Sequence, residues 1–306
     1  MSKKITFILV IILLLVVGFV VANHVATTKA KEQVNNYIYK NKLEKTVSYK
    51  EVKASVFPKH ISIKNVSIST EEKIIYINEI LVRSLDTKND IPLYGDIEIK
   101  HISSPGSEEF TETEKKLKEL GYDSLKLNLR MKFNNNKATK TQNIDYVTTI
   151  ENAFKAGFVF KLGNIDFKKM KEMQNYFKEK FNDVSPDELL SFSQNFMSVS
   201  ISYCEFYFKN EGLIDKIMEK EARDKGISEE KIKENMCKIL DMQITSAKMH
   251  KQREFFEAIK KFIKKPRKIS VKISPSKPVE IQEIIQCIKS KNTNKLLNKL
   301  NLSIDA

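Results

Sequence analysis

The four histidines of the chain are the first residues to test for metal or acid–base chemistry. His24, His60, His101 and His250 lie far apart, and none of them belongs to an HExxH pattern. A zinc protease needs two histidines on one helix face with a glutamate beside the first. The spacing therefore predicts no metal site.

A second pattern with catalytic meaning joins Ser274 and Lys277, which formally match the SxxK of penicillin-binding enzymes. In those enzymes a helix places the lysine one turn from the serine. Here Pro275 and Pro278 indicate a linker, and the SDN and KTG partner motifs are missing. The eight glycines form no phosphate-binding loop either. The sequence therefore predicts no catalytic residue and no cofactor.

The net charge and the cysteines bear on two further classes of protein, nucleic-acid-binding proteins and disulfide-rich proteins. The net charge of +14 would suit a nucleic acid or a membrane surface, but lysines outnumber arginines and alternate with acidic residues, as in Lys168–Glu172. We therefore expect a solvated surface and no nucleic-acid partner.

Cys204, Cys237 and Cys287 form no CxxC and are odd in number, so a dense disulfide framework is excluded. A bridge between Cys237 and Cys287 stays open.

The N-terminus carries an uninterrupted apolar run from Ile5 to Ala22. Eighteen helical residues span about 27 Å, close to the roughly 30 Å of a bilayer's hydrocarbon core. Lys3 and Lys4 predict a cytoplasmic N-terminus. Residues 1–22 are thus predicted to be a single-pass anchor inserted in the inner (cytoplasmic) membrane, with the rest of the chain periplasmic. A signal peptide cleaved after Ala22 is the alternative.

The remaining chain predicts an α+β fold with three parts: a stalk over 23–45, a largely antiparallel sheet region with inserted helices over 46–210, and a mainly helical region over 211–306 that packs on the sheet. The clearest strand signal is a strict alternation of apolar with polar residues from Leu125 to Phe133, which predicts one buried and one solvated face. Further strands are expected over 47–56, 61–68, 74–85, 97–101, 158–162, 199–208 and 268–274.

Helix signals interrupt and then follow these strands. Helices are predicted over 111–120, ending at Gly121, over 167–181, and from a capping box at Ser185–Glu188. After residue 211, Gly226 and Ser228 predict the end of one helix and the start of the next.

Two features suggest binding. The aliphatic strand faces would line a groove for acyl chains if the helices left them uncovered. The second feature is an amphipathic helix with a lysine-rich end, which suggests contact with lipid or a membrane, although a helix facing the core is the more ordinary reading. Its candidate contact residues are Phe255, Phe256, Ile259, Phe262, Lys264 and Lys265.

The order of features resembles bacterial envelope proteins of the YdgA-like and AsmA-like groups. The resemblance is carried by Lys3 and Lys4 with the apolar run Ile5–Ala22, and by the opening strands Val47–Val56 and Ile61–Ile68. It implies residence in the cell envelope and, for the AsmA-like group, handling of lipids. It gives no functional residues.

These observations predict a membrane-anchored, extracytoplasmic binding or structural protein that handles a lipid or an envelope protein partner. Two alternatives remain. One is a hydrolase of an envelope polymer whose catalytic carboxylates come from distant segments, and the other is a structural subunit of a secretion or division complex.

Overall fold

The protein is described from a computed structural model. The structure describes residues 3–70, 73–105, 108–123, 125–179, 194, 196–247, 250–290 and 293–306. Of residues 3–19, 108–110, 174, 177–179 and 293–294 it describes the backbone only. The predicted capping box at Ser185–Glu188 lies outside the described residues.

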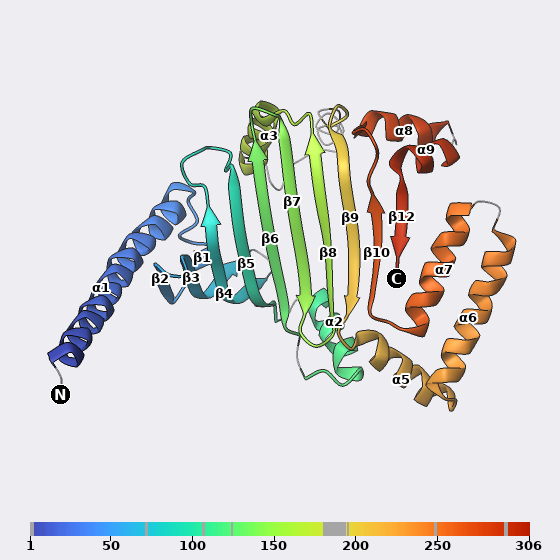
Figure 1. The fold of residues 1–306 in the computed structure, drawn as a ribbon, viewed down its shortest axis with the longest axis horizontal. Coiled ribbons are helices and arrows are strands. Elements are labelled where there is room, and N and C mark those ends of the chain that lie inside the picture. Colours follow the sequence, from blue (N-terminus) through green and yellow to red (C-terminus); the bar gives the residue numbers. More distant parts are fainter. Residues whose placement is uncertain are drawn as a thin grey trace.

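In the described part of the chain, twelve strands form one antiparallel sheet, in the order β1-β3-β4-β5-β6-β7-β8-β9-β10-β12 (Figure 1). β2 pairs with β3 and β11 with β9 beside this path. From β3 to β9 each strand pairs with the next one along the chain. The strands are β1 Val47–Ser48, β2 Glu51–Ser55, β3 His60–Ser69, β4 Ile74–Leu85, β5 Tyr94–Ser103, β6 Leu127–Asn136, β7 Thr141–Ile150, β8 Phe154–Gly163, β9 Ser200–Asn210, β10 Lys268–Ile273, β11 Val279–Glu280 and β12 Leu302–Asp305.

The helices lie around the rim of the sheet. α2 and α3 lie at opposite ends of the central strands, α1 lies beside the β2 edge, and α5, α6 and α7 lie beside the β12 edge (Figure 1). Their bounds are α1 Lys3–Lys40, α2 Glu108–Glu119, α3 Phe167–Glu179, α5 Leu213–Lys225, α6 Glu229–Ser246, α7 His250–Lys264, α8 Ile281–Lys289 and α9 Thr293–Leu300.

Two closed apolar clusters lie away from the middle of the sheet. One joins α2 to the adjoining ends of β6 and β7, with Leu117, Tyr122 and Ile150 buried. The other, here called the helical cluster, joins α5, α6 and α7 through Met218, Ile232, Cys237 and Ile263. Because burial of apolar side chains is the main force in folding, the first cluster fixes α2 to the end of the sheet, and the helical cluster holds α5, α6 and α7 to one another.

The predicted fold class is wrong in its N-terminal part. Within the residues that the structure describes, no helix combines the length and the apolar composition needed to cross a membrane. The predicted anchor Ile5–Ala22 falls largely on residues whose side chains are not described. The described part of α1 carries charged residues such as Lys29 and Glu32, and it packs on β2, where the Thr27 hydroxyl accepts a hydrogen bond from the Ala54 backbone N–H at 2.9 Å.

The fold-class prediction is also wrong in its C-terminal part. It placed a helical region after the strand-rich region, whereas β10 and β12 return to the sheet and extend it beyond β9. The three helices α5, α6 and α7 therefore form an insertion between two strands that pair with one another. The result is one large antiparallel sheet with helices around it.

Candidate functional site

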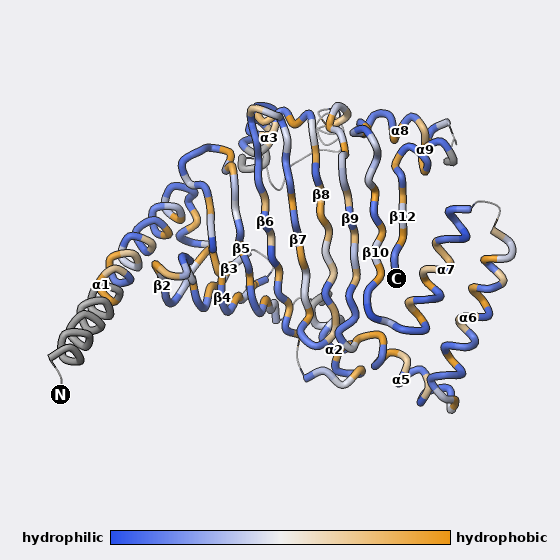
Figure 2. Tube along the Cα trace, in the orientation of Figure 1, coloured by the Kyte–Doolittle hydropathy of each residue, from blue (hydrophilic) through white to orange (hydrophobic). Residues whose placement is uncertain are grey.

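The two faces of the sheet differ in chemistry from one edge to the other. Hydrophobic and hydrophilic residues alternate along the strands (Figure 2). Because successive side chains of a strand point to opposite faces, this alternation separates an apolar face from a charged face. The pairing register then decides whether apolar residues of neighbouring strands lie next to one another.

In this sheet the register aligns apolar residues across ten strands, and we call this line of side chains the apolar row. Each member pairs directly with the next in the neighbouring strand. At roughly 4.8 Å between strands the row is about 43 Å long. Its members are Ala54, Ile61, Val82, Ile97, Met131, Tyr146, Phe158, Phe206, Val271 and Ile304.

The apolar row stays accessible although its residues are of the kind that normally forms a core. All ten side chains are half-buried or exposed, and Met131 and Phe206 are 40% and 54% exposed. A contiguous exposed apolar patch on a monomer usually marks a binding surface. In the described part of the chain, the middle of this face is therefore a surface that lacks a covering layer.

The helices cover the rim of the apolar face. α2 packs against Leu127 and Phe154 at one end of the strands. At the β9 side, the ring of Phe262 on α7 meets the ring of Phe208 edge to face, with centroids 6.0 Å apart. At the opposite end of the strands, residues of α3, β7 and β8 together line a pocket.

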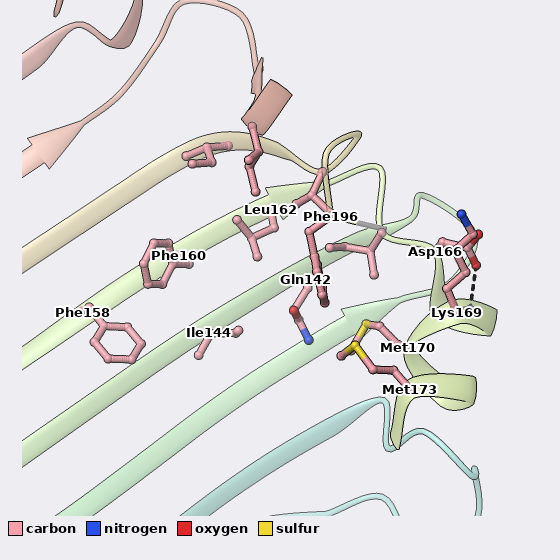
Figure 3. Close-up of a pocket in the computed structure, with 14 residues that line it drawn as sticks. Gln142, Ile144, Phe158, Phe160, Leu162, Asp166, Lys169, Met170, Met173 and Phe196 are labelled. Carbon is pink, nitrogen blue, oxygen red and sulfur yellow. Dashed lines mark hydrogen bonds between the residues drawn. The ribbon is translucent and has the colours of Figure 1, made fainter. Parts of the chain in front are cut away.

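This pocket, here called the apolar pocket, has a volume of about 370 Å³. Phe158, Phe160 and Ile144 form its floor on the sheet, and Met170 and Met173 reach toward them from α3 (Figure 3). Phe158 is also a member of the apolar row, so the pocket continues that row. The full lining is Gln142, Ile144, Phe158, Phe160, Leu162, Ile165, Asp166, Lys169, Met170, Met173, Phe196, Val199, Ile201 and Ile281.

Two polar side chains in the apolar pocket, those of Asp166 and Gln142, are already engaged in hydrogen bonds. The Asp166 carboxylate accepts hydrogen bonds from the backbone N–H groups of Lys168 and Lys169 at the start of α3, and these bonds lower its pKa. The Gln142 amide donates to the side-chain oxygen of Asn135 at 2.9 Å. Because unbranched methionine side chains adapt to different shapes, Met170 and Met173 suit a flexible apolar ligand.

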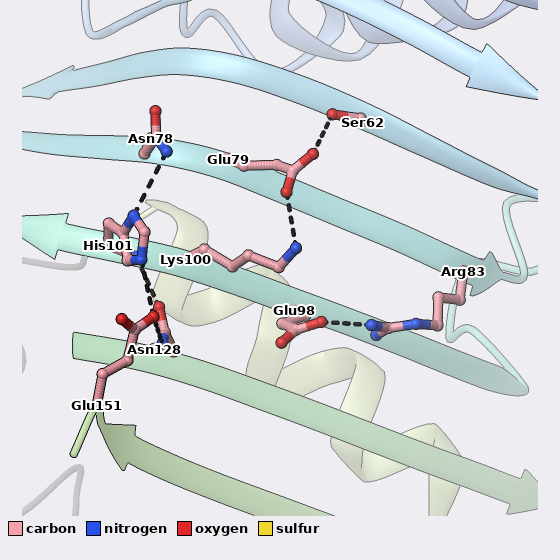
Figure 4. A network of polar contacts seen from close by, with 9 residues as sticks. All are labelled: Ser62, Asn78, Glu79, Arg83, Glu98, Lys100, His101, Asn128 and Glu151. Atoms are coloured by element: carbon pink, nitrogen blue, oxygen red, sulfur yellow. Dashed lines mark hydrogen bonds and ion pairs between the residues drawn. The ribbon is translucent and has the colours of Figure 1, made fainter. Parts of the chain in front are cut away.

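The charged face carries a network of ion pairs instead. The Glu79 carboxylate accepts from Lys100 at 2.8 Å and from the Ser62 hydroxyl at 2.5 Å, and both bonds lower the pKa of Glu79, with Lys100 contributing more (Figure 4). Arg130 binds both oxygens of Asp96 and lowers the pKa of that carboxyl in the same way. These charges satisfy one another, so the face is suited to contact with water.

His101 lies within the same network, at a bend of β5 where its φ is 51°. Its Nε2 lies 2.9 Å from the Glu151 carboxylate, which also accepts from Asn128 (Figure 4). The pKa of Glu151 is lowered chiefly by the bond with His101. The positive φ and the side-chain bonds indicate that this histidine stabilises the bend.

The predicted lipid-contact residues lie on α7, except for Lys265, which follows it directly, and none of them lines the apolar pocket. Phe262 contacts the sheet through Phe208, and Ile259 packs against the helical cluster. Phe255 is 39% exposed and stacks edge to face on Phe256, while Lys264 and Lys265 are exposed at the end of the helix. Their role in membrane or lipid contact stays a prediction.

The cysteines and the possible metal ligands add no chemistry to this site. Cys204, Cys237 and Cys287 are free, which settles the open question of a Cys237–Cys287 bridge in this structure. Over the described ranges, no group of three or more His, Cys, Asp or Glu side chains could hold a metal ion.

Sequence reasoning missed most of the apolar pocket. The alternation at Phe158, Phe160 and Leu162 was recognised, but Gln142 and Ile144 lie on a strand that was not predicted. Met170 and Met173 were placed on a helix with no assigned partner. The three-residue spacing of these methionines was a usable signal, because it puts both on one helix face.

Comparisons with known proteins give relatives but no activity. The model of a protein family described as "Uncharacterized protein" matches residues 147–306, just over half of the chain. A protein of Aquifex aeolicus (strain VF5), described in the same words, is 27% identical over 314 residues, which cover 99% of both chains. No solved structure matches. The resemblance to YdgA-like and AsmA-like proteins stays a prediction.

Proposed function

The chain belongs to the family that its second half matches, and we propose from its structure that it binds a ligand with a long apolar chain, such as a lipid. The apolar pocket receives one end of the chain, and the apolar row supports the rest. The protein acts by binding and does not transform its ligand.

One observation carries this proposal: ten apolar side chains lie in register across ten strands, and all remain accessible. Exposing such side chains to water is unfavourable by about 25 cal/mol for each Å² of apolar surface. A bound apolar chain removes that cost and gains about 0.8 kcal/mol for each methylene it buries.

The alternative of a hydrolase requires two carboxylates that face one substrate. In the described part of the chain, the apolar pocket is lined by the single carboxylate of Asp166, which already caps α3. The geometry therefore favours binding. In the alternative of a structural subunit, a protein partner and not a lipid would cover the apolar face.

The direct test is to purify the full chain, extract it with organic solvent and identify the extracted molecules by mass spectrometry. We expect lipids in stoichiometric amount from the wild type. We expect them to be depleted in an Ile144→Asn/Phe160→Asn variant, because two amides in the floor of the pocket oppose contact with an apolar chain.

A matched control is Val147→Asn/Val159→Asn, which introduces the same amides on the same two strands but on the charged face. This variant should retain its lipid. Ligand-free wild-type protein that also fails to take up a fluorescent fatty acid would refute the proposal, as would equal lipid loss from both variants when both are folded.

The periplasmic location predicted from the sequence is kept as part of this proposal, because a lipid ligand is abundant at an envelope membrane. Fractionation of cells that carry a C-terminally tagged chain tests it. Tag confined to the cytosolic fraction would contradict it.

A further inference from the structure

A second pocket lies on the other side of α3, and its lining is basic. This basic pocket has a volume of about 420 Å³ and is lined by Lys88, Asn89, Asp90, Ile91, Lys137, Phe167, Lys168 and Lys171. It contains four lysines and one aspartate. Three separate segments build it: the loop between β4 and β5, the turn between β6 and β7, and the first residues of α3.

The charge in the basic pocket is only partly balanced. Lys171 pairs with Asp90 at 2.5 Å, and the pKa of Asp90 is lowered first by this bond and then by the charges of Lys171 and Lys137. Lys168 lies 3.9 Å from Glu172 on the same helix. Among the described residues, Lys88 and Lys137 have no ion-pair partner, so an excess of positive charge faces the pocket.

The position of these lysines on α3 points to an anion. Lys168 and Lys171 lie within the first five residues of the helix, and no acidic residue lies in its first turn, although the Asp166 carboxylate just before the helix accepts from two of its backbone N–H groups. The positive end of a helix dipole disfavours cations in the first turn. A sequence that breaks such a local rule usually does so at a functional site.

The loop that carries Lys88 and Asp90 is held in place by hydrogen bonds. The Asp86 carboxylate accepts from the backbone N–H groups of Lys88 and Leu93 at 3.0 and 2.9 Å. Asn135 donates to the Pro92 carbonyl at 2.7 Å and accepts from Gln142, which lines the apolar pocket. These bonds connect the loop of the basic pocket to the lining of the apolar pocket.

The two pockets lie on opposite sides of one helix. Met170 and Met173 face the apolar pocket, whereas Phe167 and Lys171 face the basic pocket. A helix with its side chains is only about 10 Å across. One amphiphile with a head group several atoms long can therefore reach from the apolar pocket around the start of α3 to the basic pocket.

We propose that the basic pocket binds the anionic phosphate group of the ligand whose chain lies on the apolar face. This inference rests on the proposed function and narrows its ligand to an anionic phospholipid. Ammonium groups bind phosphate as point charges, and Lys88 and Lys137, whose charges are not balanced by an ion pair in the described part of the chain, suit a phosphate that carries net negative charge.

The test compares binding of the full chain to vesicles of phosphatidylcholine with and without phosphatidylglycerol. The wild type should prefer the anionic vesicles, and added salt should weaken the preference because it screens exposed charges. A Lys88→Gln/Lys137→Gln variant should lose roughly 30-fold in affinity for the anionic vesicles, since each lysine near an anionic surface contributes about five-fold.

The control variant Lys45→Gln/Lys59→Gln removes the same charge at exposed lysines near the β2 edge, which have no ion pair in the described part of the chain. It should bind like the wild type. An equal loss in both double variants would overturn the inference, because it would show a general effect of net charge.

Two further measurements separate this inference from the proposed function. Uptake of a neutral fluorescent apolar probe should be the same in the wild type and in Lys88→Gln/Lys137→Gln. Probe uptake without any preference for anionic vesicles would overturn the inference alone, and absence of probe uptake would overturn the proposed function. Titration with inorganic phosphate is the last arm: tight binding of free phosphate without vesicle preference would contradict a lipid source.

Discussion

The helical cluster and the apolar row are built from the same kinds of side chain but differ in what covers them. Ile263 in the helical cluster is 7% exposed, whereas Phe206 in the apolar row is 54% exposed. Three helices close over the first region, and the second has water or a ligand above it. The comparison teaches that the same kind of apolar side chain is covered by neighbouring helices in one region and left accessible in the other.

The largest effect on stability is expected in the helical cluster. Ile263→Ala should lower the free energy of unfolding by about 3 kcal/mol, because it leaves a cavity between packed helices. Chemical denaturation checks this value. Binding of a fluorescent fatty acid by the folded variant should stay at the wild-type level, and a loss of binding would show that the two regions are coupled.

A substitution in the apolar row should have the opposite effects, with little loss of stability and a clear loss of binding. Phe206→Ala should change the free energy of unfolding by less than about 1 kcal/mol, since its side chain is already largely in water. Binding of the fatty acid should weaken by about 2 kcal/mol, roughly 30-fold, because the ligand loses the burial of one phenyl ring. Strong destabilisation without loss of binding would contradict the view that the row is a binding surface.

The smallest effect is expected when acid weakens the loop between β4 and β5, which contains Asp86. Hydrogen bonds from Leu93 and Lys88 lower the pKa of Asp86 from 3.8 to about 2. A carboxyl with a lowered pKa stabilises the folded loop above pH 4, and this contribution is lost as the pH falls from about 4 to 2.

Hydrogen exchange of the Lys88 and Leu93 amides measures this change. Both amides should lose protection toward pH 2, while amides of the helical cluster keep theirs. Asp86→Asn should exchange faster at pH 7 and show a weaker dependence on pH. Protection in the wild type that is unchanged at pH 2 would contradict the assigned role of the carboxylate.

Local signals predicted the strands and helices well where one residue type decides the structure. The run Ile74–Leu85 is β4 with the predicted bounds, and Ser228 caps α6 by accepting from the Lys231 backbone N–H. Gly226 ends α5 with a φ of 64°, a conformation that glycine adopts without strain. These features depend on residues close together in the chain.

Burial could not be predicted in the same way. The alternation from Leu125 to Phe133 predicts β6, which spans Leu127–Asn136, but it also predicts one buried face and one solvated face. Leu125, two residues before β6, is buried in the cluster with α2, while Met131 within β6 is 40% exposed. Alternation shows that a face is apolar, and only the placement of the helices decides whether that face is covered.

Long-range pairing explains the remaining errors. β7 mixes polar and apolar residues and becomes a strand between β6 and β8, which supply its hydrogen bonds. β12 is four residues long and pairs with β10 across the segment that contains α8 and α9. The two pockets also need α3 at a particular place at the ends of the strands, and no local pattern in the sequence encodes that placement.

The consecutive pairing from β3 to β9 has a consequence for how such a protein changes length. Any hairpin inserted between two neighbours would find its partners locally and would leave the register on either side intact. Each insertion would lengthen the molecule by about 10 Å, twice the distance between strands. Relatives with more or fewer hairpins would therefore have a longer or shorter apolar row. Such a row would suit a longer or shorter ligand, while the helices at the two edges of the sheet could stay the same.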